Sequence, residues 1–510
     1  MTSETILRLC SLTMLSAVCL AKNVVLLPPP MSSYIIYHAN IGQALIELGH
    51  NVSLCVPEYL SNKELVPHKR INIIRYGEHL GDVQAKILKS IDLRGQFWQG
   101  KPQTFLSRFP LIHMFKELVH EVLSDSKFLA AIQEHKPELF IIDNLMYIRN
   151  ILVLPYKLGI PFSLIGSFSD SVLGGIPFHP ASEPLVLEYA SYNKTFFERV
   201  KAVIMSLIFL SYDLFSDADV VSRYAPEKAY MTIRDIALKA EIFIAETDHI
   251  LDYPRTSLPN TKLIGGSSVG EAKPLSGEVK KFVEESSRGV AVVSFGGYDV
   301  NLPDDIRSKM ETAFQNLNLN VVWKINGTFE KQDKILALNW IPQNDLLGHP
   351  KTTVFISHCG KNGQYEALYH GVPILCLPMF FDQFYNSERI FVKGFGQYAD
   401  IRDITPDELV RLIQEIADDT KFRANIQKAS KIFRELYKIP SKEAAFWLDH
   451  VMKYGGDYMR SSGQKMPLYQ FLLLDVIAFL LCILIIAIYL VLYVVKLCCY
   501  RFRIIKVKND

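Results

Sequence analysis

Residues 340–386 read WIPQNDLLGHPKTTVFISHCGKNGQYEALYHGVPILCLPMFFDQFYN, and this stretch decides the fold. Its TTVFIS run is β-branched and aromatic, whereas its KNGQYEALYH run holds good helix formers closed by Gly371. The pattern predicts a strand, a glycine turn and a helix. In open parallel sheets ligands bind beyond the carboxyl ends of the strands, and a helix amino terminus offers unpaired N–H groups to a phosphate. We therefore expect a diphosphate at Gly360, Asn362 and Gly363.

Side chains on both sides of this turn suit the other parts of a nucleotide-sugar. Glu366 lies about one turn into the predicted helix, where a carboxylate can accept hydrogen bonds from both hydroxyls of a ribose. Trp340 and Gln343, upstream of the strand, offer a flat apolar face and an amide to a base such as uracil. Asp382 and Gln383 follow the next predicted strand at the same edge of the sheet. They suit the hydroxyls of a hexose.

This block resembles the signature of the UDP-glycosyltransferase family, and more closely that of its membrane-bound animal branch, the UDP-glucuronosyltransferases. The resemblance extends from about Asn23 to the tail. It includes DYPRTSLPNTKLIGG at residues 252–266, VVSFGG at residues 292–297 and PSKEAAFWLDHVMKYGGDYMR at residues 440–460. A short motif alone would be weak, but the signature is long and its parts occur in the family's order.

The resemblance implies a fold and an activity. The fold is α/β, with two doubly wound Rossmann-like domains facing each other across a crevice (the GT-B type), followed by a C-terminal transmembrane helix. The activity is inverting transfer of glucuronic acid or another hexose from a UDP-sugar to small lipophilic acceptors. The UDP-sugar is a co-substrate, so no cofactor is expected, and no metal is expected. Homo- or hetero-oligomers with related transferases are compatible with this assignment.

Residues around the predicted phosphate site allow more than one interpretation. His358 either points a ring nitrogen at the diphosphate, which we favour, or is an ordinary histidine at a strand end. Lys361 either assists the leaving group or is a solvated charge. Arg255 either forms a salt bridge in the linker or reaches the donor. Ser294 is expected to contact a phosphate, whereas Gly297 stands where the family often has a second serine.

The first domain departs from the family at the catalytic base. Counting back from Gly49–His50, which resembles the family's RGH, places Tyr34 where family members have a histidine. In the family this histidine, held by an aspartate, removes the proton of the acceptor hydroxyl. Asp143, at the end of the predicted strand LFIID, matches that aspartate, or it caps the following helix. His38 lies about one helical turn after Tyr34, and it either acts as a displaced base or simply packs.

Two functional classes follow from Tyr34. The first is an active transferase with a shifted base, or with acceptors such as tertiary amines that are already nucleophilic and need none. The second is a UDP-sugar-binding pseudoenzyme that regulates active partners in the same membrane. We favour the enzyme, because the expected donor contacts are present apart from Gly297 and the changed residues within HCGKNG.

Strand-like apolar runs alternate with helical runs along the chain and predict two α/β domains. The runs in the first are VVLLPPP, NVSLCVP, LFIIDNL, FSLIGSF and EIFIAETD, and those in the second are VAVVSFGG, NVVWKI, ILALNW, VFISHCG and PILCLP. We place an N-terminal acceptor-binding domain at residues 22–270 and a C-terminal UDP-sugar-binding domain at residues 285–440. A returning helix and juxtamembrane linker occupy residues 441–466.

The two ends of the chain predict a membrane protein. Residues 1–21 read as a secretory signal peptide, and an uncharged run within residues 475–496 is long enough to span a bilayer core of ~30 Å. The tail at residues 497–510 is basic, which places it in the cytoplasm and the catalytic domains in the lumen. Lys506 and Lys508 resemble a dilysine retrieval signal or form an ordinary basic flank. We predict a single-pass type I protein of the endoplasmic reticulum membrane.

A formal net charge of +2 leaves no electrostatic footprint for nucleic acid. Sequons at Asn51, Asn193 and Asn326 are compatible with lumenal glycosylation. The run VIMSLIFL at residues 203–210 is too short to span a bilayer, and we interpret it as a buried helix rather than an apolar patch that touches membrane or acceptors.

Cysteine usage gives little functional information. The predicted lumenal part contains Cys55, Cys359 and Cys376. Three cysteines cannot all pair internally, and nothing in their spacing suggests a metal site, so we interpret them mainly as small buried residues.

Overall fold

The structure is a computed structural model in which the chain forms two compact units, Met1–Met459 and Arg460–Asp510. It describes residues 21–61, 65–66, 68–82, 109–177, 179–183, 194–211, 213, 215–296, 302–325, 333–379 and 382–509. The predicted signal peptide up to residue 20, the sequons at Asn193 and Asn326, and Gly297 lie outside these residues.

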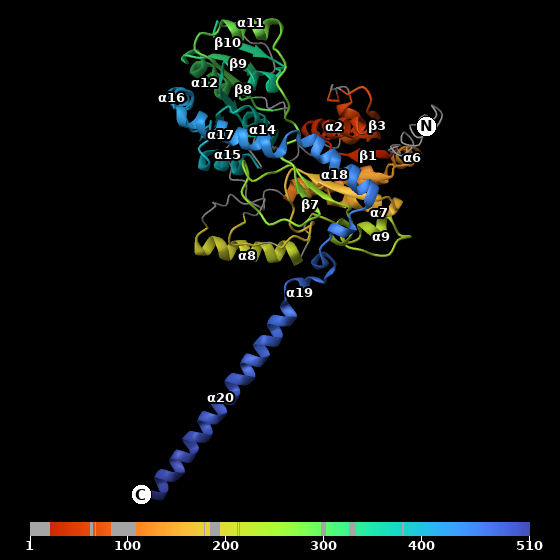
Figure 1. The fold of residues 1–510 in the computed structure, drawn as a ribbon, viewed down its shortest axis with the longest axis vertical. Helices are drawn as coiled ribbons and strands as arrows, with labels where there is room; N and C mark the ends of the chain where they lie inside the picture. Colours follow the sequence, from red (N-terminus) through yellow and green to blue (C-terminus); the bar gives the residue numbers. More distant parts are fainter. Residues whose placement is uncertain are drawn as a thin grey trace, which may run out of the picture. The chain divides into compact units, whose positions relative to one another are not determined.

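Two parallel sheets form the frame of the first unit (Figure 1). The first sheet has the order β3-β2-β1-β4-β5-β6-β7 and the second the order β10-β9-β8-β11-β12-β13. The strands of the first sheet are β1 Asn23–Leu27, β2 Asn51–Pro57, β3 Asn72–Tyr76, β4 Leu139–Asp143, β5 Phe162–Gly166, β6 Phe243–Ala245 and β7 Thr261–Leu263. Those of the second are β8 Val290–Ser294, β9 Asn320–Lys324, β10 Ile335–Leu338, β11 Thr352–Ser357, β12 Ile374–Cys376 and β13 Gly396–Tyr398.

Both sheets are doubly wound, as predicted. The strand order reverses between β1 and β4 in the first sheet and between β8 and β11 in the second. Such switch points are where open α/β sheets bind ligands, beyond the carboxyl ends of the strands. All the predicted strand-like runs form strands of these sheets, whereas the short strands β3, β7 and β13 were not predicted.

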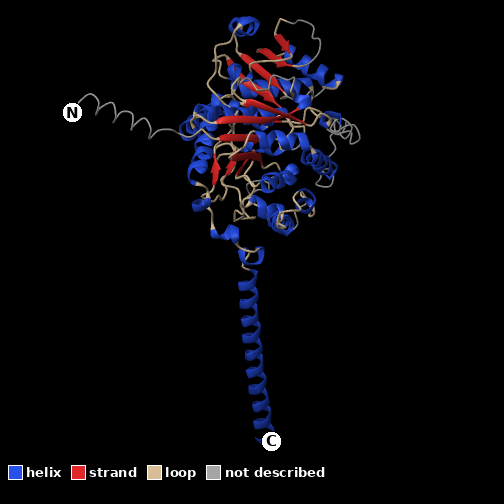
Figure 2. Ribbon diagram, turned by 90° about the vertical axis from the view of Figure 1, so that its right-hand side faces the viewer, coloured by secondary structure: helices blue, strands red, loops and turns tan. Residues whose placement is uncertain are grey.

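Helices cover the faces of the sheets (Figure 2). They are α2 Ser32–Glu47, α5 Phe109–Ser124, α6 Ser126–Glu134, α7 Val153–Leu158, α8 Phe196–Ser211, α9 Val220–Tyr224, α10 Ile233–Ala237, α11 Gly277–Glu285, α12 Asp304–Gln315, α13 Gln343–Leu347, α14 Lys361–His370, α15 Gln383–Val392, α16 Pro406–Asp418, α17 Thr420–Tyr437 and α18 Pro440–Tyr454. The described part of this unit also contains the 3-10 helices η1 Glu58–Leu60, η3 Met146–Leu152 and η4 Asp457–Met459.

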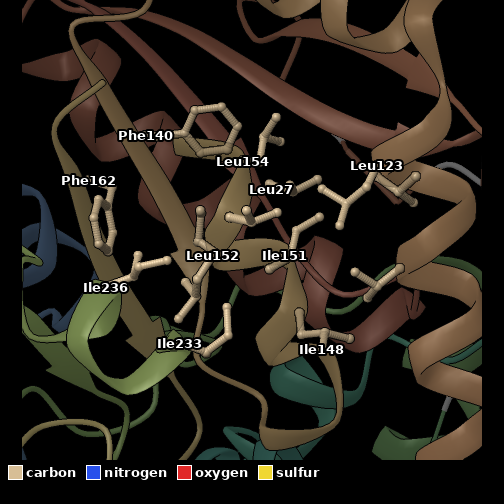
Figure 3. Close-up of a cluster of buried hydrophobic side chains, with 14 of the residues drawn as sticks. Leu27, Leu123, Phe140, Ile148, Ile151, Leu152, Leu154, Phe162, Ile233 and Ile236 are labelled. Carbon is tan, nitrogen blue, oxygen red and sulfur yellow. The ribbon is translucent and has the colours of Figure 1, made fainter. Parts of the chain in front are cut away.

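Apolar side chains from strands and helices fill the space on one face of the first sheet (Figure 3). Phe140 of β4 and Phe162 of β5 belong to the same buried cluster as Leu152 of η3 and Ile233 of α10. Parallel strands are buried on both faces, which explains why their sequences are nearly continuous apolar runs. The core therefore holds β4, β5 and their loops in fixed positions.

Helix α18 returns to the first domain. Ala444 and Leu448 of α18 share a buried cluster with Ile35 and Ile41 of α2. The end of α2 is also fixed by polar contacts, since His50 Nε2 lies 3.1 Å from Asp449 Oδ1. The C-terminal helix thus packs against the helix that carries Tyr34.

The prediction of a buried helix at residues 203–210 is wrong. These residues belong to α8, which exposes apolar side chains along its length, including Phe197 at 79% and Ile204 at 53% of their surfaces. The run is rich in apolar residues but does not lie in the core.

The second unit contains η5 Ser462–Lys465, α19 Leu468–Phe471 and α20 Leu474–Asn509. Within α20, residues Leu474–Arg501 contain an 18-residue window with a mean hydropathy of 3.1, and none of that window is buried. Among the described residues this is the one helix long and apolar enough to cross a membrane. It is therefore a candidate membrane span at the predicted place.

Candidate active site

The predicted strand, turn and helix at residues 352–371 are present. Strand β11 ends at Ser357, and Gly360 is the N-cap of α14 with extended dihedral angles of φ −63° and ψ 147°. Gly371 ends the helix with a φ of 69°, a left-handed conformation that suits glycine. Asn362 and Gly363 lie in the first turn of α14, where N–H groups lack partners within the helix. The amino end of α14 is therefore a suitable anion site.

His358 stands at the switch point of the second sheet. The adjacent strands pair Ser357 with Ser294, the buried last residue of β8. A Cβ at either Gly296 or Gly360 would collide with the His358 ring, so both neighbours need to be glycine. Burial lowers the pKa of His358 to about 4, against the effect of a hydrogen bond with the Ser294 backbone. The ring is therefore neutral at physiological pH and can donate or accept a single hydrogen bond at each nitrogen.

The residues predicted to hold the nucleoside come together. Gln343, the first residue of α13, donates from Nε2 to Glu366 Oε2 of α14 at 2.6 Å. Burial raises the pKa of Glu366 to about 7, and the hydrogen bond from Gln343 opposes this rise. Trp340 exposes 73% of its surface, and Lys324 Nζ lies 5.2 Å from the centre of its ring. The amide and the carboxyl group predicted to hold the nucleoside are thus in contact, and the predicted ring, three residues before Gln343, is exposed.

The pair predicted to hold the hexose has two different environments. Asp382 is the N-cap residue of α15 and is partly exposed, and its Oδ2 accepts a hydrogen bond from Asn386 Nδ2 at 2.7 Å. Gln383 exposes 3% of its surface, and its Oε1 accepts from the N–H of Met379 at 2.8 Å. Asp382 is thus the member of the pair with the more accessible side chain.

The turn between β11 and α14 is fixed at Cys359. This residue has a left-handed φ of 58°, uncommon for a side chain with a Cβ. Its carbonyl accepts hydrogen bonds from Gln364 at 2.9 Å and from Asn386 at 3.0 Å. Its sulfur forms a disulfide with Cys376, with the two Cα atoms 5.2 Å apart. All three cysteines of the predicted lumenal part are buried, as interpreted, and Cys55 is free, but the bond between Cys359 and Cys376 was not predicted.

Tyr34 lies in the first turn of α2, after β1 at the switch point of the first sheet. His38 is fully buried one turn later, and its Nδ1–H donates to the Tyr34 carbonyl at 2.9 Å. Its Nε2 has no partner within the described part of the chain. Burial lowers the pKa of His38 to about 3, so the ring resists protonation at neutral pH.

Asp143 is the buried last residue of β4, on the other side of the same switch point. Its Oδ1 accepts from the N–H of Leu145 at 2.8 Å. The following helix η3 begins at Met146 and has Leu145 as its N-cap, so the interpretation of Asp143 as a helix cap is wrong. Oδ2 has no hydrogen-bond partner among the described residues. The side chain therefore keeps one oxygen for another role.

Lys361 is not a solvated charge. Its side chain is 9% exposed, and its Nζ lies 2.6 Å from Ser167 O and 3.4 Å from Glu246 Oε2. Both partners belong to the first domain, so this lysine links the two domains. Arg255 forms the salt bridge that was one of its two predicted roles, with its Nη2 3.4 Å from Asp252 Oδ1. Nη2 also donates a hydrogen bond to Tyr385 Oη at 2.7 Å.

Sequence reasoning missed Glu246. It directly follows β6, and its exposed fraction is 1%. The signal was the same as for Asp143, namely a carboxylate at the carboxyl end of a buried strand, in EIFIAETD. Asn51, by contrast, was predicted as a sequon and is exposed at the start of β2.

A family model described as UDP-glucoronosyl and UDP-glucosyl transferase matches residues 23–509. The chain belongs to the UDP-glycosyltransferase family. Human UDP-glucuronosyltransferase 2B15 is 28% identical over 500 residues, covering 94% of this chain and 93% of the relative. Human UDP-glucuronosyltransferase 2B17 is 31% identical over 402 residues, covering 76% of this chain and 74% of the relative. The chain is thus a glycosyltransferase similar to animal UDP-glucuronosyltransferases.

Solved glycosyltransferases share the fold. The glycotransferase of kitacinnamycin superposes with a TM-score of 0.60 at 17% identity, covering 84% of this chain and 99% of its own. A UDP-glucosyltransferase from Polygonum tinctorium superposes with a TM-score of 0.57 at 15% identity, covering 86% of this chain and 100% of its own. These likenesses show the two-domain GT-B fold of this UDP-glycosyltransferase.

Proposed function

We propose that this UDP-glycosyltransferase moves glucuronic acid or another hexose from a UDP-sugar to small lipophilic acceptors. The observation that carries the proposal is the direct contact of Gln343 with Glu366 beside the amino end of α14. In this arrangement the donor would lie along the carboxyl edge of the second sheet, at its switch point. Its base would lie over Trp340, its ribose at Glu366, its diphosphate at Gly360 and its hexose at Asp382. Glucuronic acid is the first sugar to test, because similar animal relatives are named as glucuronosyltransferases.

The acceptor preference that we propose follows from the presence of Tyr34 in place of a histidine base. A tyrosine hydroxyl has an ordinary pKa of about 10 and is a poor proton acceptor at neutral pH. Amines need no proton removal before attack, and acidic phenols need little. These classes should therefore be better acceptors than weakly acidic alcohols.

We place the activity in the lumen of the endoplasmic reticulum, with α20 as the span of a single-pass type I protein. The apolar character of Leu474–Arg501 and the basic tail after it support this orientation. Partners would then be the UDP-sugar, the acceptor, the membrane and related transferases in it.

An acceptor screen with several radiolabelled UDP-sugars tests the function. Microsomes that contain the full chain should transfer label from at least one UDP-sugar to an amine or a phenol, and microsomes without it should not. If the donor binds but no acceptor is labelled, the chain is a UDP-sugar-binding pseudoenzyme. This alternative is motivated by Tyr34, which stands where the family has its histidine base.

A further inference from the structure

Three buried charged groups meet at the carboxyl edge of the first sheet. Asp143 ends β4 and Glu246 follows β6, and β5 lies between these strands. Lys361 reaches the edge from the start of α14 in the other domain and contacts both Glu246 and the carbonyl of Ser167, which follows β5. Asp143 exposes 2% of its surface and Glu246 1%. Two buried carboxyl groups therefore lie at the same edge of the sheet, and the ammonium group of Lys361 pairs with one of them, Glu246.

Glu246 is saturated with donors. Its Oε1 accepts from the N–H of Ser267 at 2.9 Å and from the Ser267 hydroxyl, while its Oε2 pairs with Lys361 at 3.4 Å. Three donors from Ser267 and Lys361 therefore hold the Glu246 carboxyl group in place.

Asp143 has the opposite environment. Only the N–H of Leu145 donates to it, and Oδ2 has no donor in the described part of the chain. An unpaired buried acceptor is unfavourable, so a hydroxyl group brought to Oδ2 would supply the missing hydrogen bond. Among the described residues, Glu246 and Lys361 are the charged groups that act on Asp143. Burial raises the pKa of Asp143 well above its ordinary value, Glu246 raises it further, and Lys361 lowers it.

The two alternatives on α2 are weaker bases. Tyr34 presents a phenol, which is largely protonated at neutral pH unless its environment changes it. His38 is fully buried, and a ring with a pKa of about 3 holds a proton poorly. A carboxyl group whose pKa is raised by burial takes up a proton more readily than an ordinary aspartate, and Asp143 also has an unpaired oxygen to receive it.

Building on the proposed transferase function, we propose that the Asp143 carboxylate itself takes the acceptor's proton in this chain, with Glu246 and Lys361 as the positioning residues that set its charge. The proton of the acceptor hydroxyl passes to Oδ2 as the acceptor oxygen forms its bond to the anomeric carbon. The bond from that carbon to the diphosphate oxygen breaks, and UDP leaves with its electron pair. The contact of Lys361 with the first domain thereby connects helix α14, at the proposed donor site, with the proposed base Asp143.

The pH dependence of kcat/KM with a phenol acceptor tests this assignment in the full-length protein. Activity should rise on the acid side as Asp143 ionises. Glu246→Gln removes the negative charge that raises the pKa of Asp143, so this acid limb should move to lower pH by roughly one unit. Lys361→Met removes the positive charge that lowers it, so the limb should move to higher pH by a similar amount.

Conservative and remote variants serve as controls. Lys361→Arg keeps the charge and should keep the profile of the unmodified chain. Glu285→Gln, which breaks an exposed pair with Lys281 at 3.9 Å, should leave the profile unchanged. Asp143→Asn should lower transfer to a weakly acidic phenol by ~10²–10⁴ while transfer to a tertiary amine persists, since the amine needs no base.

Shifts in the same direction, or no shift, in folded Glu246→Gln and Lys361→Met variants would overturn the assignment of Asp143 as base. Retained phenol transfer in Asp143→Asn would do the same even if one interface variant does not fold. Amine transfer reports folding and donor binding in every variant. The absence of any product from the unmodified chain, with amines included, would instead refute the proposed function.

Discussion

At the scale of single residues, we predict that Glu366 links the ionisation state of the site to donor binding. Burial raises the pKa of this carboxyl group to about 7, although Gln343 donates a hydrogen bond to it. Only the ionised form can accept hydrogen bonds from both ribose hydroxyls without carrying a proton of its own.

Donor affinity should therefore increase as the pH rises through about 7. Equilibrium binding of a UDP-sugar, whose diphosphate does not titrate in this range, measures the effect. Glu366→Ala should weaken binding by roughly 1.5–3 kcal/mol and remove the pH dependence. Glu284→Ala, at an exposed position of α11, is the matched control. Unchanged affinity in Glu366→Ala would remove Glu366 from the donor site.

The sequence was informative about residues that act within one local motif. Gln343 and Glu366 could be placed together because the strand and helix between them have an unambiguous pattern. The partner of Lys361 could not be predicted, because Glu246 lies 115 residues away in the other domain. The burial of His38 could not be predicted either. A residue one helical turn after Tyr34 can face either the active site or the core.

At the scale of elements, the turn between β11 and α14 combines a left-handed cysteine with a disulfide to β12. Cys376 pairs with Ser357 in the sheet register, so the two cysteines meet at the carboxyl edge of adjacent strands. The cysteine count alone did not indicate this pair, because the adjacency of β11 and β12 is a tertiary property. The exposure of α8 was not predicted for a related reason. Whether other elements pack against an apolar run is also a tertiary property.

Loss of the disulfide between Cys359 and Cys376 should make the turn between β11 and α14 more mobile. The bond closes a segment with a sequence separation of 17, for which chain entropy predicts a loss of ~3 kcal/mol in the free energy of unfolding. A reductant should raise the KM for UDP-sugar in the unmodified chain. The double variant Cys359→Gly with Cys376→Ala keeps the left-handed turn without the bond, and it should not respond to reductant. Equal responses of both proteins would show that reduction acts elsewhere.

At the scale of the whole molecule, the chain divides into a two-sheet unit and a unit that contains α20. The alternation of strands and helices predicted the first, and the length of the apolar run predicted the helix of the second. The proposed direction of insertion rests on the basic tail.

Protease added to sealed microsomes should remove only residues after Lys496. The main unit should become sensitive when detergent opens the vesicles, because we propose that it lies in the lumen. Changing Lys506 and Lys508 to Ser should let some protein reach the cell surface. Cleavage of the main unit in intact vesicles would reverse the orientation.

The central claim is that this UDP-glycosyltransferase works without the family's histidine base, and Tyr34→His tests it most directly. The rates of transfer to an alcohol and to a tertiary amine should be compared in the unmodified chain and in the variant. We predict a large gain for the alcohol, within the ~10²–10⁴ range of a positioned base, and little change for the amine. Equal effects on both acceptors, or no gain for the alcohol, would contradict the account.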